Sequence, residues 1–84
     1  MIKKRESRNQ QAGEAPLKKL RDELDMSQEE FGRHIGVSAR TVSRWEAGDS
    51  TPTFTVKQMK LLDHLLQLHG RSIQSLPDNF AANN

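Results

Sequence analysis

The first regular alternation of hydrophobic and polar residues in the chain begins after residue 15. Leu17, Leu20 and Leu24 recur three or four positions apart, and most residues between them are charged. This spacing places the leucines on one face of a helix. Pro16 is suited to open that helix, because its missing N–H would have no partner in the first turn. The pattern predicts a helix from Pro16 to near Asp25.

Two short helices joined by a three-residue turn are predicted next. Ser27 and Glu30 have the spacing of a capping box, in which each side chain bonds the backbone N–H of the other residue. Gly36 suits the left-handed conformation at a helix end, and Ser38 caps the following helix, Ala39–Ala47. A further glycine follows that helix. A turn this short makes the two helices cross steeply, which is typical of a helix-turn-helix.

The second half of the chain predicts a loop and two more helices. Residues 48–53 have the composition of a loop. A second capping box starts a longer helix near Val56, and an apolar stripe continues it toward Gly70. Ser72–Leu76 is expected to form a short final helix. No segment has the alternation of a strand, so the sequence predicts an all-α fold with five helices.

The two ends of the chain lack this periodicity. Residues 1–15 carry four Lys or Arg against two Glu, whereas the remaining residues carry nine of each sign. We expect a disordered basic N-terminal arm over 1–15, a domain over 16–76 and a flexible tail over 77–84. The basic arm is compatible with a nucleic-acid partner, but equally with a terminus that only aids solubility.

Composition argues against several other classes of protein. A chain of 84 residues forms one domain at most, and it has no cysteine for a disulfide or a thiolate metal site. Its longest apolar run is broken by Asp63 and His64, so no membrane partner is expected. No hydrophobic stretch follows the basic N-terminus, as a signal peptide would need. These features favour a cytoplasmic protein.

No cofactor, metal site or catalytic group is expected. The neutral metal ligands on offer are His34, His64 and His69, with no cysteine to accompany them. His64 and His69 lie five positions apart and do not share a helix face. No serine has an orienting base in the sequence pattern, which argues against an enzyme.

The helix predicted over Ala39–Ala47 has two different faces. Val42 and Trp45 point to the core. The opposite face is polar, basic and free of carboxylates, and comprises Ala39, Arg40, Ser43, Arg44 and Ala47. Such a face suits the major groove, where arginine can donate two hydrogen bonds to guanine N7 and O6. A merely solvated face is the alternative, but the turn before this helix favours DNA binding.

Several stretches together resemble the phage-repressor-type (Xre/Cro-like) helix-turn-helix family. They are Leu17-Lys-Lys-Leu-Arg21, Ser27-Gln-Glu-Glu-Phe31, Ile35-Gly-Val-Ser38, Thr41-Val-Ser-Arg-Trp-Glu-Ala-Gly48 and Pro52. The resemblance covers residues 17–76. It implies a compact five-helix, lambda-repressor-like DNA-binding domain whose second and third helices form the helix-turn-helix. It also implies a transcriptional regulator, in most cases a repressor, that binds a double-stranded DNA operator as a homodimer.

The resemblance implies roles for individual residues as well. The positions expected to read base edges are Ala39, Arg40, Ser43 and Arg44. The positions expected to contact phosphates are Gln28, Ser38, Thr41, Ser50, Thr51 and Thr53. Ser38 is equally explained as a helix cap. Arg21 and Glu46 are expected to form a mostly buried ion pair between the first and third helices.

Three functions stay open at this point. The first is a sequence-specific repressor. The second is an antitoxin that represses its own operon and holds a toxin, with the tail over 78–84 as a candidate partner segment. The third is a protein-interaction adaptor that uses the same fold without reading DNA.

The fourth predicted helix runs about one turn longer than in many relatives of this family, which leaves the packing of Ser72–Leu76 and the dimer surface open.

Overall fold

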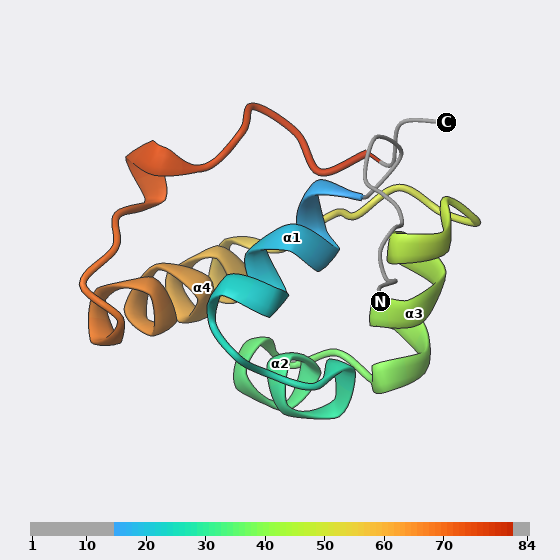
Figure 1. Cartoon of the computed structure of the whole chain (residues 1–84), viewed down its shortest axis with the longest axis horizontal. Coiled ribbons are helices and arrows are strands. Elements are labelled where there is room, and N and C mark those ends of the chain that lie inside the picture. The colour runs from blue at the N-terminus through green and yellow to red at the C-terminus, as the bar shows by residue number, and fades with distance from the viewer. Residues whose placement is uncertain (1–14, 82–84) are drawn as a thin grey trace, which may run out of the picture.

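The computed structural model of the chain describes residues 15–81. This part of the chain contains four α-helices and one 3-10 turn, and it has no strand (Figure 1). The elements are α1 (Pro16–Glu23), α2 (Gln28–Ile35), α3 (Ala39–Ala47), α4 (Val56–Leu68) and the 3-10 turn η2 (Ile73–Ser75). The predicted all-helical fold is therefore confirmed. In Figure 1, α3 stands at one end of the molecule and α4 extends toward the other.

The fifth α-helix expected over Ser72–Leu76 is instead a single 3-10 turn. The Ser72 hydroxyl caps this turn by accepting from the Gln74 N–H at 3.0 Å. Leu76 has extended backbone, and Pro77 follows it. A residue before proline is disfavoured in the helical region, because the proline ring collides with its backbone. This restriction ends the turn before it can grow into an α-helix.

Local capping sets the boundaries of the other helices. Both predicted capping boxes are present: the Ser27 hydroxyl accepts from the Glu30 N–H at 3.0 Å, and the Thr55 hydroxyl accepts from the Gln58 N–H at 3.0 Å. In each box the second side chain also accepts from the first residue's N–H. Gly36 ends α2 in the left-handed conformation, with a φ of 84°.

The Ser27 box gives the fold one pH-dependent contribution. The pKa of the Glu30 carboxyl lies below its ordinary value of 4.5, chiefly because the carboxylate accepts a hydrogen bond from the Ser27 backbone N–H. The folded-state pKa is the lower one, so this stabilisation is complete above pH 4.5 and is lost as the pH falls through the native value.

We therefore expect the wild type to lose more stability than Glu30→Gln between about pH 6 and about pH 3. Glutamine can accept the same hydrogen bond but does not titrate. Urea unfolding of both proteins at the two pH values measures the difference. An equal loss in the two proteins would contradict this role of Glu30.

The hydrophobic core is built by all four helices and by the C-terminal segment. Its buried members are Leu17, Leu20, Leu24, Phe31, Ile35, Val42, Trp45, Leu62, Leu65, Leu66 and Phe80. All except Phe80 recur at helical spacing, so burial of apolar surface and helix formation select the same residues. This core packs α1, α2 and α4 together and against the buried side of α3.

The C-terminal segment departs from the predicted domain boundary. It runs from the far end of α4 back toward α3 (Figure 1), and Phe80 is only 8% exposed. The Phe80 ring stacks edge-on against Phe54, with ring centroids 6.1 Å apart, and Phe54 stacks against Trp45 at 5.3 Å. The core therefore extends past Leu76, where the sequence places the start of a flexible tail. The end of that tail, 82–84, lies outside the described residues.

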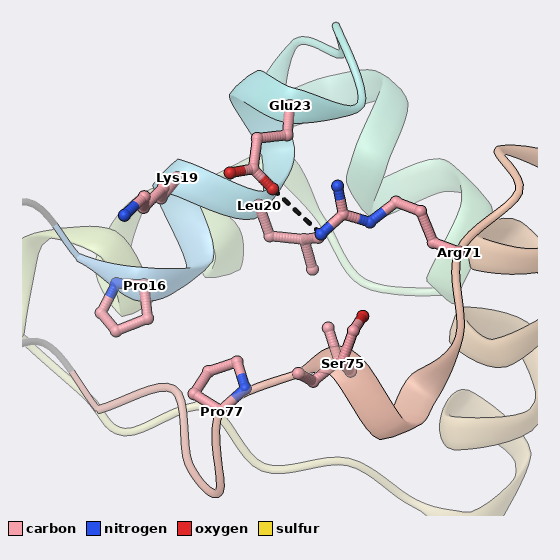
Figure 2. A pocket seen from close by; sticks show the side chains of 8 residues that line it. Pro16, Lys19, Leu20, Glu23, Arg71, Ser75 and Pro77 are labelled. Carbon is pink, nitrogen blue, oxygen red and sulfur yellow. Dashed lines mark ion pairs between the residues drawn. The ribbon is translucent and has the colours of Figure 1, made fainter.

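A hollow lies between α1 and the C-terminal segment. Figure 2 shows its lining, with Pro16 and Leu20 from α1 facing Ser75 and Pro77. An ion pair closes one side, formed by Arg71 Nη2 and a Glu23 carboxylate oxygen 3.0 Å apart.

Residues 1–14 of the predicted basic arm lie outside the described part of the chain. No helix among the described residues is long and apolar enough to cross a membrane.

Candidate nucleic-acid interface

The turn between α2 and α3 depends on the close approach of two backbones. The N–H groups of Gly36 and Val37 both donate to the Gly32 carbonyl, at 2.8 and 2.9 Å. Gly32 is buried, and a Cβ atom added to it would overlap the carbonyl oxygen of Val37. A glycine at this position therefore lets the turn pack directly against α2, which fixes how α3 leaves it.

Gly32→Ala is expected to destabilise the fold by about 1–3 kcal/mol, because the backbone of the turn must shift to admit the methyl group. Helix propensity alone predicts the opposite, a gain of about 1 kcal/mol. Urea unfolding measures the change, and His34→Ala, at an exposed position of the same helix, is the matched control. A Gly32→Ala protein at least as stable as the wild type would contradict the close approach.

The two predicted faces of α3 are present in the structure. Val42 and Trp45 are buried, at 0% and 6% exposed. The residues that are exposed on the opposite face are Arg40, Ser43, Arg44 and Ala47, and Ala39 beside them is half-buried. Both arginines thus face solvent from the outer side of a helix whose inner side is anchored in the core.

The only carboxylate of α3 is turned away from this face. Glu46 is 6% exposed in its side chain and pairs with Arg21 of α1, which is 11% exposed. Arg21 Nε donates to Glu46 Oε2 at 2.8 Å, and Arg21 Nη2 donates to Oε1 at 3.1 Å. The structure thus brings together the two residues expected to pair. The hydrogen bond to Glu46 raises the pKa of Arg21 against the opposing effect of burial.

Arg21 also makes a contact that the sequence does not reveal. Its Nη1 donates to the Met26 carbonyl at 2.8 Å, so one guanidinium joins α1, the loop before α2, and α3. Three donor nitrogens of a rigid planar group are engaged, two by the Glu46 carboxylate and one by the Met26 carbonyl. This arrangement fixes the orientation of α3 relative to α1.

Gln28 is the first residue of α2, and its side chain is bound within the protein. Its Nε2 donates to Glu46 Oε1 at 3.0 Å, and the residue is half-buried. The family resemblance implied a phosphate contact for Gln28 but no partner within the fold. The contact joins residues 18 positions apart, and no local spacing rule predicts such a pair.

Ser38 and Thr41 lie at the start of α3. The Ser38 hydroxyl accepts from the Thr41 N–H at 3.0 Å, so Ser38 is the helix cap. The same hydroxyl donates to Thr41 Oγ1 at 3.1 Å, which uses its one hydrogen. The Thr41 hydroxyl keeps its own hydrogen, and of the two side chains it is the better placed to donate to a phosphate.

The loop between α3 and α4 supplies the remaining predicted phosphate positions. Thr51 and Thr53 are exposed, and Ser50 is half-buried. Phe54 then anchors the end of the loop beside Trp45, as described above. The loop is therefore attached to the inner side of α3 while its hydroxyl groups remain near the surface.

Among the described residues, no group of three or more His, Cys, Asp or Glu side chains is placed to hold a metal ion. What the surface offers is a basic helix face, a capped helix start and a hydroxyl-bearing loop. Charged and hydroxyl donors of this kind suit a polyanion, because arginine can bind base edges and hydroxyls can bind phosphates.

Comparison with known proteins identifies this arrangement. Searches of curated proteins and of solved structures gave no match. Residues 17–56 match the helix-turn-helix family model, which confirms the resemblance seen in the sequence. The matched segment runs from α1 through the turn and α3 to the first residue of α4. Over residues 17–56 the chain is thus similar to the helix-turn-helix family of the Cro/C1 type, whose members are DNA-binding regulators of transcription.

Proposed function

We propose that the protein is a sequence-specific repressor that inserts α3 into the major groove of a double-stranded operator. The observation that carries this proposal is the exposed, basic face of α3, from which the one carboxylate of the helix is withdrawn into an ion pair. In this role Arg40 and Arg44 donate to guanine N7 and O6, and Ala39 contacts a thymine methyl. Ser43 reads a base edge or the adjacent backbone.

Phosphate contacts hold the helix in register on the duplex. We assign them to Gln28, Ser38, Thr41, Ser50, Thr51 and Thr53. Thr41 has a hydroxyl hydrogen to donate, whereas the Ser38 hydroxyl donates to Thr41. For Ser38 the contact would therefore use its backbone or require the hydroxyl to turn.

The operator is bound by a homodimer, with one copy of α3 in each half-site. The half-sites of such a dimer lie about 34 Å apart, on one face of the duplex. Binding to chromosomal DNA would place the protein with the nucleoid.

Selection of bound sequences from a random pool of double-stranded DNA tests the proposal. The expected result is a pseudo-palindromic site whose half-sites are centred about 10 base pairs apart. A promoter carrying that site should then be repressed by the protein in a reporter strain. Failure to enrich any sequence, together with the absence of salt-dependent binding to DNA, would overturn the proposal and favour the adaptor. Repression that requires a co-purifying toxin would instead indicate an antitoxin.

A further inference from the structure

Glu46 accepts hydrogen bonds from two different elements through a single oxygen. Its Oε1 accepts from Arg21 Nη2 at 3.1 Å and from Gln28 Nε2 at 3.0 Å. A carboxylate can only accept, so the amide of Gln28 must present its nitrogen to Glu46. One N–H of that nitrogen is used in this contact, and the second N–H keeps its capacity to donate.

Glu46 can occupy this position beside a DNA-binding surface because its charge is compensated. An isolated carboxylate on α3 would repel the phosphate backbone. Arg21 places two donors on it, and the Glu46 side chain is only 6% exposed. The pair thus presents no net charge to DNA, while the acceptor oxygen that faces Gln28 is kept.

We propose that Glu46 is a positioning residue for a DNA phosphate contact. It holds the Gln28 amide at the start of α2, so that the second N–H of Gln28 Nε2 is offered to a phosphate oxygen. Fixing a flexible glutamine before binding lowers the entropy lost when DNA arrives. This inference rests on the proposed DNA-binding function and adds a residue that acts through Gln28 without touching DNA itself.

A matched pair of substitutions separates this role from simple electrostatics. Glu46→Leu and Glu46→Gln both remove the negative charge and leave Arg21 without an ionic partner, but only glutamine retains an acceptor oxygen for Gln28. The measurement is the dissociation constant of the full chain for its selected DNA site at a fixed salt concentration. Because the Gln28 amide is neutral, losing its phosphate contact should weaken binding and leave the slope of log affinity against log salt unchanged, since that slope counts the phosphates neutralised by Lys or Arg.

Glu46→Gln is expected to keep the Gln28 contact, and Glu46→Leu to lose it. The Glu46→Leu protein should bind the site about 2- to 10-fold more weakly than the Glu46→Gln protein, as expected for the loss of one hydrogen bond. In a Gln28→Ala background the two Glu46 variants should have the same affinity. Equal affinities with Gln28 present, or a difference that persists without it, would overturn the inference.

Glu23→Leu and Glu23→Gln provide the control pair, because Glu23 also pairs with an arginine, Arg71, at 3.0 Å. These two variants should have equal affinities for the site. If the wild type itself fails to select a DNA site, the proposed function fails. If it selects one but the Glu46 pair behaves like the Glu23 pair, only the present inference fails.

A measurement on the wild type keeps the inference testable if Glu46→Leu does not fold. The side-chain NH₂ group of Gln28 should be rigid by nuclear magnetic resonance relaxation in the free protein, unlike that of the exposed Gln74. Its signals should shift when DNA is added. A freely rotating Gln28 amide, or one that DNA leaves unchanged, would overturn the inference.

Discussion

Arg21→Leu is expected to lower the free energy of unfolding by about 3–5 kcal/mol, because it leaves the Glu46 carboxylate buried without its cation. The Met26 carbonyl also loses the donor that it has at 2.8 Å. Both members of the pair are nearly inaccessible to water, so solvent cannot replace the lost contacts. Urea unfolding at neutral pH measures the loss.

Arg71→Leu is the control for this prediction. Arg71 also pairs with a glutamate, but its partner Glu23 is 44% exposed, and such pairs contribute about 1 kcal/mol or less. The double variant Arg21→Leu/Glu46→Leu should regain much of the loss, since an apolar pair can replace a buried ion pair at little cost. An Arg21→Leu protein no less stable than Arg71→Leu would contradict the structural role of the ion pair.

Arg40→Ala/Arg44→Ala is expected to weaken binding to the selected site by about 2–6 kcal/mol. Each arginine that donates to a guanine contributes about 1–3 kcal/mol of discrimination, and separate base contacts add approximately. Binding to random DNA should weaken far less, so the preference for the site over other sequences should shrink. Competition binding with the selected and a scrambled duplex measures both affinities.

The loss of DNA affinity in this double variant should come from the missing base contacts and not from a less stable fold. Arg40 and Arg44 are exposed, so their substitution should change the free energy of unfolding by about 0.5 kcal/mol or less. Arg33→Ala is the matched control, because Arg33 is an exposed arginine on α2 instead of α3. A double variant that keeps its preference for the site would show that other residues read the bases.

The sequence predicts this fold best where the determinants are local. The capping boxes at Ser27 and Thr55, and Gly36 after α2, depend only on residues a few positions away in the sequence. Their spacing therefore locates the helix ends. The faces of α3 follow from helical periodicity. The short helix after Ser72 was the exception, because the restriction that Pro77 places on Leu76 outweighs the apolar spacing.

The features that the sequence does not predict depend on contacts between residues far apart in the chain. Phe80 is an isolated aromatic residue in a polar tail, and only the position of Phe54 in space explains its burial. The contact between Gln28 and Glu46 likewise exists because Arg21 fixes α3 beside the start of α2. The ion pair was expected from family resemblance, whereas its third partner depends on side-chain geometry.

The most direct test of DNA reading by α3 is to alter single atoms in the major groove of the selected site. Replacing guanines one at a time by 7-deazaguanine removes the N7 acceptor and leaves base pairing intact. At one or more positions this should weaken binding of the wild type but not of Arg40→Ala or Arg44→Ala. Unchanged wild-type binding at every guanine, with sensitivity only to minor-groove changes, would contradict the account.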